Sequence, residues 1–225
     1  RLKDWAHKEG RLVLVFEWIE MDLSKKIERG PLPSKQVKQY LFQLLKAMDY
    51  CFKRAIMHRD LKPANLLVEG DDMLKVADFG LGRTFGIPIR PYTLEVVTLY
   101  YRAPEILLGA KRYTPSIDMW SIGTIFAEMV LGHVLWPGDS EIGQVFQIFQ
   151  TLGTPLEEDC PELARLPGYN PHFPSWPQKP WSRVIPSSSL DEEGIDLLSK
   201  MLQLSPSKRI SAKEALVHPY FDDLR

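Results

Sequence analysis

The segment HRDLKPANLL (residues 58–67) places an acid, a cation and an amide at short, fixed offsets and then runs into apolar sequence. Thirteen residues after Asn65, the segment ADFGLGR (residues 77–83) adds another carboxylate, Asp78, shortly before two glycines. The polar side chains that could act together are Asp60, Lys62, Asn65 and Asp78. A reaction that needs all four of these residues would indicate both the fold and the function of the chain.

Phosphoryl transfer from a nucleotide would use all of these residues, because it needs a positioned Mg²⁺ ion and a positioned acceptor hydroxyl more than covalent chemistry by the protein. Mg²⁺ prefers hard oxygen ligands, which Asp78 offers as a carboxylate and Asn65 as a neutral amide. Asp60 would accept a hydrogen bond from the hydroxyl and take its proton late. Lys62 would place a compact positive charge on the transferring phosphate. The predicted catalytic residues are therefore Asp60, Lys62 and Asn65.

Each residue also has an ordinary structural interpretation, because Asp, Lys and Asn often cap turns or stay solvated at a surface. The combination is more specific. The patterns H-R-D-L-x-x-x-N and D-F-G occur here in order, followed by APE (residues 103–105), and all three are protein-kinase signatures. The chain therefore resembles a protein kinase, and Lys62 within HRDLKPAN resembles the Ser/Thr branch rather than the Tyr branch.

Three longer segments indicate which group of protein kinases the chain resembles. FGIPIRPYTLEVVTLYYRAPEILLG (85–109), LWPGDSEIGQVFQIFQTLGTP (135–155) and KRISAKEALVHPYF (208–221) are similar to the cyclin-dependent kinases. The resemblance implies an ATP-dependent Ser/Thr kinase that uses Mg²⁺, acts in the cell cycle and phosphorylates Ser/Thr-Pro sites in protein substrates. It also implies a cyclin partner.

Composition agrees with a globular protein of one or two domains. The 225 residues are 44% hydrophobic and 25% charged, with a net charge of -1, so no bulk attraction to nucleic acid or anionic lipid is expected. The two cysteines, Cys51 and Cys160, are too few for a disulfide framework or a metal cluster. The most apolar stretch, residues 119–132, is too short to span a membrane and predicts a buried helix. We expect no nucleic-acid or membrane partner, and a cytoplasmic and/or nuclear location.

Periodicity predicts a mostly helical chain. Residues 11–18 are β-branched and aromatic and favour a strand, whereas residues 65–68 and 74–77 flank a polar turn and favour a hairpin. Ser34 is a candidate cap for a helix whose apolar residues follow the i, i+3, i+4 spacing. Further helices are expected over 116–131, 140–152, 191–204 and 211–217. Two loops are expected, one over 79–104 and a proline-rich one over 167–181 that Trp176 and Trp181 attach to the body.

The predicted fold class is mainly α, a protein-kinase-like C-terminal helical lobe with small β-hairpins that forms part of an α+β two-lobe kinase fold. The resemblance assigns residues 1–225 to a partial kinase domain. Within it, 1–22 form the end of the N-terminal sheet and the hinge, and 23–225 form the C-terminal lobe. That lobe contains the catalytic loop region, 57–68, and the activation segment, 78–105.

The kinase signatures of the N-terminal lobe are missing from the sequence. These are a glycine-rich loop, a V-A-I-K lysine and a helix glutamate. The pair Gly80 and Gly82 lies inside DFGLGR and does not supply the loop. We expect the isolated chain to bind nucleotide weakly and to transfer phosphate poorly.

The resemblance also assigns the nucleotide contacts. Glu17 and Ile19 would present backbone groups to the adenine, with Phe16 at the back of the pocket. Asp22 would meet the ribose, and Leu67 would lie under the base, although an ordinary core position in a strand explains Leu67 equally well. The full predicted nucleotide-binding set is Glu17, Ile19, Asp22, Lys62, Asn65, Leu67 and Asp78, of which Asn65 and Asp78 are the metal ligands.

Regulation and substrate selection fall in the 79–104 loop. Thr93 matches the activating phosphorylation site of the family, and Arg59 and Arg83 match two arginines that would receive its phosphate. Val97, Thr98 and Arg102 match the loop that binds the acceptor peptide and favours a proline after the acceptor. The family usually has Trp where Tyr100 stands.

Three matched positions are predicted to be structural: Asp118 would anchor the catalytic loop, and Glu105 would pair with Arg209. Asp139–Gly143 resembles the docking surface for Cks adaptor proteins, but Gly143 departs from the usual acidic residue, and a helix start capped by Ser140 is an equal alternative. An alternative hypothesis is that the whole chain is a truncated, catalytically weak module that binds cyclin, Cks or substrate.

Overall fold

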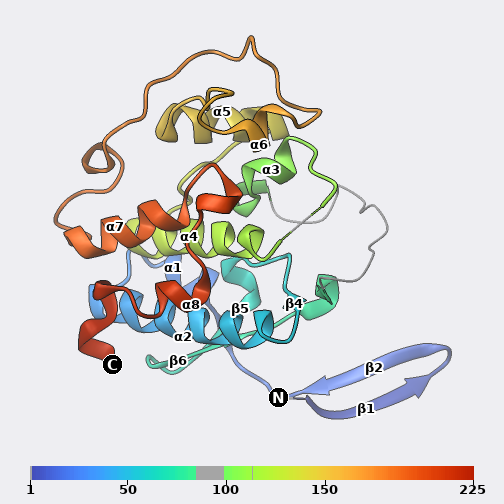
Figure 1. Cartoon of the computed structure of the whole chain (residues 1–225). Coiled ribbons are helices and arrows are strands. Elements are labelled where there is room, and N and C mark those ends of the chain that lie inside the picture. The colour runs from blue at the N-terminus through green and yellow to red at the C-terminus, as the bar shows by residue number, and fades with distance from the viewer. Residues whose placement is uncertain (1, 85–98, 113) are drawn as a thin grey trace.

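The structure is a computed structural model of the chain, and it describes residues 2–84, 99–112 and 114–225 (Figure 1). The strands are β1 (Leu2–Lys8), β2 (Arg11–Phe16), β3 (Met21–Asp22), β4 (Ile56–Met57), β5 (Leu66–Glu69), β6 (Met73–Val76) and β7 (Arg83–Thr84). The helices are α1 (Leu23–Ile27), α2 (Ser34–Phe52), α3 (Pro104–Leu107), α4 (Ser116–Leu131), α5 (Glu141–Leu152), α6 (Pro161–Ala164), α7 (Glu192–Met201) and α8 (Ala212–Ala215). Short 3₁₀ turns lie between them. The described part of the chain is therefore mainly helical with small sheets, as predicted.

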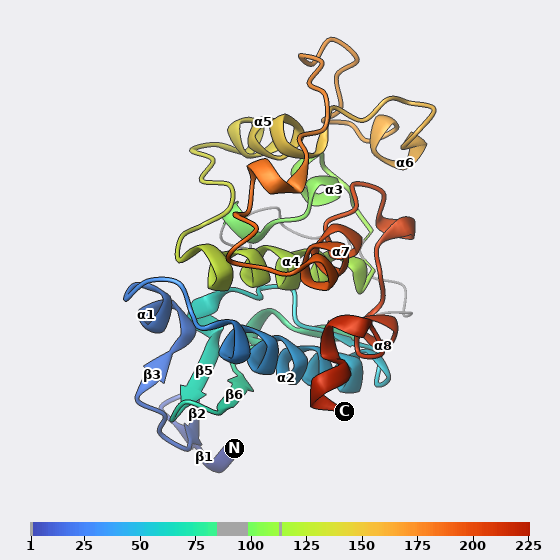
Figure 2. The same cartoon turned by 90° about the vertical axis from the view of Figure 1, so that its left-hand side faces the viewer.

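Helix α4 is the centre of the hydrophobic core. It is apolar around nearly its whole circumference, which requires burial on all sides. It packs on α2 and α7, and both views show it between α2 on one side and α5 on the other (Figures 1 and 2). The predicted buried helix is thus confirmed, and no helix in the described residues is long and apolar enough to cross a membrane.

The other predicted helices differ from the observed helices mainly in the residues at which they begin and end. Helix α4 has the predicted bounds, and α5 begins one residue late because Ser140 caps it. Helix α7 ends at Met201, three residues early, and α8 is a single turn that opens with a capping box between Ser211 and Glu214. The prediction that Ser34 caps α2 is wrong. Pro33 holds the cap position without a side-chain hydrogen bond, and Ser34 is already helical.

The predicted small hairpin is present as β5 and β6. These strands pair antiparallel, and β3 joins on the other side of β5, so the sheet order is β3-β5-β6. The two-residue strands β4 and β7 form a separate pair in which Met57 lies opposite Arg83. The β4–β7 pair and the β5–β6 hairpin therefore hold the two ends of the 58–65 loop next to the two ends of the 77–82 segment.

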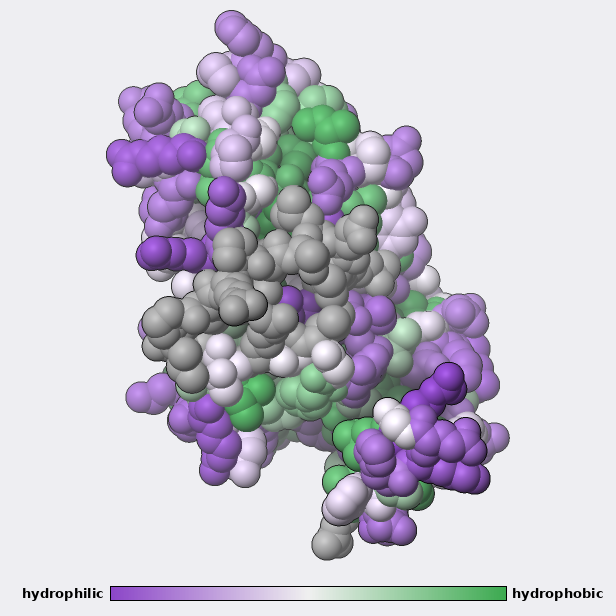
Figure 3. All heavy atoms as spheres, turned by 90° about the vertical axis from the view of Figure 1, so that its right-hand side faces the viewer, coloured by the Kyte–Doolittle hydropathy of each residue, from purple (hydrophilic) through white to green (hydrophobic). Residues whose placement is uncertain are grey.

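Strands β1 and β2 form a ribbon that extends away from the body (Figure 1). Every residue of both strands is exposed, including Trp5 at 64% and Phe16 at 59% of their surface. Figure 3 shows the ribbon standing clear of the body, with hydrophobic and hydrophilic residues mixed on its surface. The predicted position of Phe16 at the back of a pocket is therefore not formed by the described residues.

The proline-rich segment is fixed by aromatic side chains, as expected. The Trp176 and Phe173 rings both meet Phe146 of α5, at centroid distances of 5.4 and 5.5 Å. Trp181 is half-buried against the core. This segment therefore packs on α5 without forming a long helix of its own.

The predicted Glu105–Arg209 ion pair is present and buried. The Arg209 guanidinium donates to both carboxylate oxygens of Glu105, at 2.8 and 3.1 Å, and to the carbonyl oxygens of Ser116 and Gln203. The Arg209 side chain is fully shielded from solvent. This network ties α3 to the start of α4 and to the chain after α7.

Replacing Arg209 with Met should destabilise the protein strongly, because Glu105 would stay buried without its partner. We expect the free energy of unfolding to fall by about 3–5 kcal/mol. The control is Lys53→Met, which breaks a surface pair with Asp49 and should cost at most about 1 kcal/mol. Urea denaturation of both variants measures the difference, and equal losses would contradict the assigned role of Arg209.

Candidate active site

The loop that carries Asp60 is held by one buried carboxylate from α4. The backbone N–H groups of His58 and Arg59 each donate to an oxygen of Asp118, both at 2.8 Å. Asp118 is 1% exposed, and burial raises the pKa of its carboxyl, although the two backbone N–H groups oppose that shift. Arg59 has a φ of 71°, a left-handed conformation that a non-glycine residue adopts only when its surroundings fix it. The predicted anchoring role of Asp118 is confirmed.

His58 connects this loop to the end of β6. Its Nδ1 accepts from the N–H of Asp60 at 3.3 Å, so its Nε2 carries the proton and donates to the carbonyl oxygen of Ala77 at 2.8 Å. Its ring also packs on that of Phe79, with centroids 4.6 Å apart. This connecting role of His58 was not predicted from the sequence. Its signal was its place at the head of HRD, next to two residues with predicted roles.

Asp60, Lys62 and Asn65 lie together as predicted. Lys62 Nζ lies 3.0 Å from Asp60 Oδ2, and Asn65 Nδ2 donates to both the carbonyl oxygen and Oδ2 of Asp60, at 2.8 and 3.1 Å. The other carboxylate oxygen, Asp60 Oδ1, is buried and has no hydrogen-bond partner among the described residues. A buried acceptor without a donor is costly in a folded protein. Oδ1 is therefore the atom in this cluster that is suited to accept a hydrogen bond from a ligand.

The β5–β6 hairpin places Asp78 next to this cluster. The N–H of Ala77 donates to the carbonyl oxygen of Asn65 at 2.9 Å, so Asp78 follows directly on a backbone contact with Asn65. Asp78 has a φ of 58°, and its Oδ1 accepts from the N–H of Gly80 at 3.2 Å. A Cβ on Gly80 would lie 2.9 Å from that oxygen, which explains the glycine at this position. The exposed Asp78 carboxylate keeps its Oδ2 available.

The predicted nucleotide contacts fall into two groups. Asp22 and Leu67 are cross-strand partners of β3 and β5, so the predicted ribose contact and the predicted floor lie side by side. The Asp22 side chain also caps α1 by accepting from the N–H of Lys25 at 3.0 Å. Glu17 is held by Lys75 at 3.1 Å, and Ile19 is half-buried.

Several predicted regulatory and substrate residues cannot be placed. Thr93, Val97 and Thr98 lie outside the described residues, and of Arg83 only the backbone, paired with Met57, is described. Arg59 is buried beside Asp118. These assignments stay predictions.

Arg102, the last predicted substrate residue, is buried and forms an ion pair with Glu141 in the first turn of α5. The adjacent residue, Tyr101, donates to Glu128 at 2.8 Å, and its carbonyl oxygen accepts from Ser121 at 2.9 Å. Burial raises the pKa of Tyr101, and the nearby Glu128 adds to this effect. Three polar contacts to α4 and α5 thus fix the chain just after the 85–98 segment.

The Asp139–Gly143 segment is the capped start of α5. Ser140 accepts from the N–H of Gly143 at 3.1 Å and donates to Asp139 at 3.0 Å, so the structural alternative is confirmed. A Cβ on Gly143 would lie 2.4 Å from Asp139 Oδ1. The Ile142 side chain remains 46% exposed.

Comparison with known proteins identifies the family. Residues 1–221 match the protein kinase domain. The chain is also 53% identical, over 99% of its length, to the "Cell division control protein 2 homolog 3" of Trypanosoma brucei brucei, and the match covers 72% of that protein. The chain belongs to the protein kinase family. Within it, the chain is a Ser/Thr kinase of the cyclin-dependent type, and the alternative of a non-catalytic module is not favoured.

The residues of this kinase fit a nucleotide-bound Mg²⁺ ion, which protein kinases in general use with ATP. Asn65 uses its Nδ2 group to bond Asp60, which leaves its carbonyl oxygen as a possible ligand beside the Asp78 carboxylate. No group of three His, Cys, Asp or Glu side chains capable of holding a metal ion occurs in the described parts of the chain. The protein would therefore supply only part of the coordination, and phosphate and water oxygens would supply the rest.

The Asp118 anchor can be tested by Asp118→Asn. An asparagine offers one acceptor oxygen to two backbone N–H groups, so one of these groups loses its partner at a cost of about 1–3 kcal/mol. Hydrogen exchange at the His58 and Arg59 amides should then accelerate by roughly ten- to a hundredfold. Asp196→Asn is the control, because that carboxylate pairs with Lys200 on the surface. Unchanged exchange in Asp118→Asn would show that the loop is held by other contacts.

Proposed function

We propose that this kinase transfers the γ-phosphate of ATP to Ser or Thr side chains of protein substrates, with a preference for a following proline. The observation that carries the proposal is the buried Oδ1 of Asp60, which has no hydrogen-bond partner among the described residues and is held beside Lys62 and Asn65. A serine or threonine hydroxyl would satisfy that oxygen. The acceptor oxygen would then bond to the γ-phosphorus, the bond from that phosphorus to the β–γ bridging oxygen of ATP would break, and Asp60 would take the hydroxyl proton.

The neighbouring residues position the reacting groups. Asn65 orients the Asp60 carboxylate through two hydrogen bonds, and its own carbonyl oxygen would hold Mg²⁺ together with Asp78. When bound, Mg²⁺ neutralises charge on the phosphate oxygens. Lys62 is paired with Asp60 at 3.0 Å, and a phosphate arriving at this site would compete for its ammonium group. The shift of Lys62 toward the phosphate would leave Asp60 free to accept the hydroxyl proton.

The hinge and β5 would bind the nucleoside. Glu17 and Ile19 would present backbone groups to the adenine, and the cross-strand pair of Asp22 and Leu67 would meet the ribose and the base. The exposed hydrophobic side chains of the β1–β2 ribbon, such as Trp5 and Phe16, support the proposal that a further, N-terminal lobe covers this side, with residues 1–22 as the end of its sheet and 23–225 as the C-terminal lobe. That lobe would supply the remaining nucleotide contacts.

Regulation is proposed to follow the family. Phosphate on Thr93 would bind Arg59 and Arg83, and a cyclin would activate the kinase. A Cks adaptor would dock at Asp139–Gly143, which the exposed Ile142 supports. The relative's printed name supports a role in cell division. We also propose a cytoplasmic and/or nuclear location.

Two substitutions test the catalytic assignment in the full-length kinase with its cyclin. Asp60→Asn should lower kcat by about 10²–10⁴-fold with little change in KM for ATP, because Asp60 acts on the hydroxyl. Asp78→Asn should instead raise the Mg²⁺ concentration needed for half-maximal rate. Asp72→Asn, at the exposed tip of the β5–β6 hairpin, is the control. Steady-state kinetics on an acceptor peptide measures these values, and a kcat within threefold of wild type for Asp60→Asn, roughly 0.7 kcal/mol in barrier, would overturn the proposal.

Proline selection can be tested through Glu141, the ion-pair partner of Arg102. Glu141→Gln removes the charge that holds the Arg102 guanidinium. The ratio of kcat/KM for a peptide with proline after the acceptor to one with alanine should fall by roughly two- to fivefold, the size expected of a partly exposed pair. Glu157→Gln, an exposed carboxylate elsewhere, should leave the ratio unchanged. An unchanged ratio in Glu141→Gln would show that the pair does not contribute to proline selection.

A further inference from the structure

A second pocket lies between the C-terminal end of α5, the proline-rich segment and the chain that follows α7. Its walls come from residues 152–156, 176–181 and 199–208, together with Asp159 and Cys160, and its volume is about 350 Å³. We call it the tryptophan pocket, because two tryptophans of the proline-rich segment line it. The residues of the catalytic loop do not line it. Its volume falls within the usual range of about 300–1,000 Å³ for ligand sites.

Hydrogen bonds hold two walls of the tryptophan pocket together. The N–H of Thr154 donates to the carbonyl oxygen of Trp176 at 3.0 Å, and the N–H of Lys179 donates to that of Thr151 at 2.9 Å. Thr154 Oγ1 also accepts from the N–H of Trp176 at 3.0 Å. The segment that carries the tryptophans is thus fixed to the end of α5. A ligand would not have to order this wall, which lowers the cost of binding.

The interior of the tryptophan pocket is apolar. Leu202 and Cys160 are 2% and 3% exposed, and the neighbouring Leu204 is half-buried. Trp176 and Trp181 are half-buried as well, so part of each indole remains accessible from the pocket. Aromatic rings bind other rings in offset or edge-to-face contacts. The pocket therefore suits a ligand that carries an aromatic group.

Two charged side chains of opposite sign line the tryptophan pocket. Lys208 Nζ donates to the main-chain carbonyl oxygen of Asp159 at 3.3 Å, so the ammonium lies next to the residue that carries the carboxylate. Both side chains are exposed, and neither forms an ion pair with the other or elsewhere in residues 2–84, 99–112 and 114–225. Both charges are therefore open to a ligand.

A third charged group near the tryptophan pocket is already occupied. Glu162 does not line the pocket, and it accepts a hydrogen bond from Ser205. That hydrogen bond lowers the pKa of Glu162, and the Lys208 charge adds a smaller effect. Glu162 therefore leaves the charges that face a ligand as one ammonium and one carboxylate.

A ligand with one carboxylate and one ammonium group would satisfy both of these side chains. Because Lys208 and Asp159 are linked through a single hydrogen bond, the two ligand charges must also lie close together. An aromatic acid would leave Asp159 without a partner, and an aromatic amine would leave Lys208 without one. Two opposite charges on one carbon atom beside an aromatic ring describe an aromatic α-amino acid.

We propose that the tryptophan pocket binds a free aromatic α-amino acid. The ring lies against Trp176 and Trp181 and over Leu202, the α-carboxylate accepts from Lys208, and the α-ammonium donates to Asp159. The bound amino acid connects the end of α5, the proline-rich segment and the chain after α7. The site is separate from the catalytic loop, so binding requires neither ATP nor an acceptor peptide.

Fluorine NMR without nucleotide measures this binding, and its result is independent of the proposed function. The full-length kinase is titrated with fluorine-labelled phenylalanine up to about 10 mM, which detects a Kd of about 1 mM or tighter. Saturable binding is expected. In competition, alanine should bind at least about tenfold more weakly, because it lacks the ring. Phenylethylamine and phenylpropionate each lack one charge and should bind about three- to tenfold more weakly.

Two outcomes of this titration would overturn the proposal. The first is the absence of saturable binding of phenylalanine. The second is phenylpropionate binding as tightly as phenylalanine, which would indicate a site for aromatic acids in which Asp159 has no role.

Substitutions with matched controls locate the site. Lys208→Met and Asp159→Asn should each raise the Kd for phenylalanine about three- to tenfold, because each removes one charged partner. Lys208→Arg keeps the charge and should stay within about twofold of the wild-type Kd. Glu158→Gln and Lys213→Met remove exposed charges that do not line the pocket and should leave the Kd unchanged. Equal Kd values across all of these variants would contradict the assigned site.

Discussion

Two hydrogen bonds from the catalytic loop to the buried carboxylate of Asp118 carry the arrangement of the candidate active site. The loop follows a two-residue strand and has little regular structure of its own, so its backbone N–H groups need partners from elsewhere. Asp118 is in the first turn of α4, the helix around which the core is packed. The site is therefore fixed to a helix that is buried along nearly its whole length, and Arg59 can be held in a left-handed conformation that the loop alone would not keep.

From this anchor, contacts lead outward to each functional side chain. His58 joins the loop to the end of β6 and, through that strand, places Asp78 beside Asn65. Asn65 in turn orients Asp60, whose Oδ1 has no hydrogen-bond partner in the part of the chain that the structure describes. A fully satisfied cluster would be more stable, so the unpaired oxygen marks a position where stability is given up for ligand binding.

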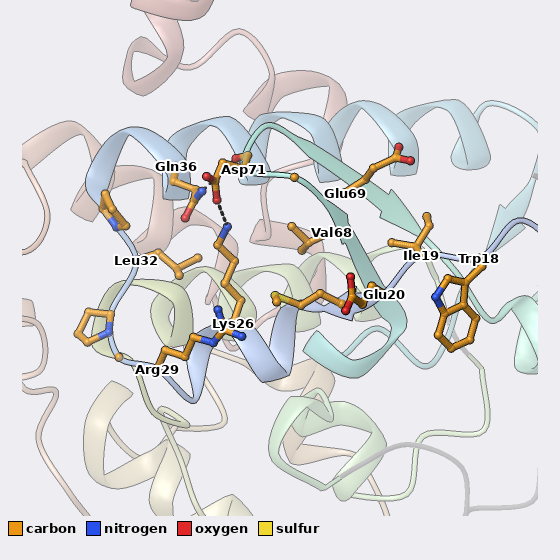
Figure 4. A pocket seen from close by; sticks show the side chains of 15 residues that line it. Trp18, Ile19, Glu20, Lys26, Arg29, Leu32, Gln36, Val68, Glu69 and Asp71 are labelled. Atoms are coloured by element: carbon orange, nitrogen blue, oxygen red, sulfur yellow. Dashed lines mark hydrogen bonds and ion pairs between the residues drawn. The ribbon is translucent and has the colours of Figure 1, made fainter.

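The hinge separates two surfaces of different chemistry. On one side, the backbone of Glu17 and Ile19 and the pair of Asp22 and Leu67 face the proposed nucleotide site. On the other side lies a pocket lined by residues 18–21, 29–33 and 68–71, one wall of which is the β5–β6 turn (Figure 4). Both surfaces share β5, since Leu67 and Val68 are consecutive and point to opposite faces of the strand.

The sequence by itself determined the catalytic set and the main elements. Asp60, Lys62, Asn65 and Asp78 were recognisable because their spacing is local, within one loop and one hairpin. Helix α4 was predictable to the residue because its apolar run has clear ends. Helices α7 and α8 were predicted too long, because the turns that end them depend on packing around Arg209 and the C-terminal residues rather than on periodicity.

Only the tertiary structure decided the relations between distant segments. The bonds of Asp118 to the loop span 59 and 60 residues, and the Glu105–Arg209 pair spans 104. Resemblance could suggest these pairs, but burial and geometry established them. The contact of the β5–β6 turn with α2 gave no sequence signal, because the side chains of Gln39 and Gln43 bond to the carbonyl oxygen of Asp72 across 33 and 29 residues. Local spacing determines the chemistry of a site, whereas long-range packing determines which surfaces are available to other molecules.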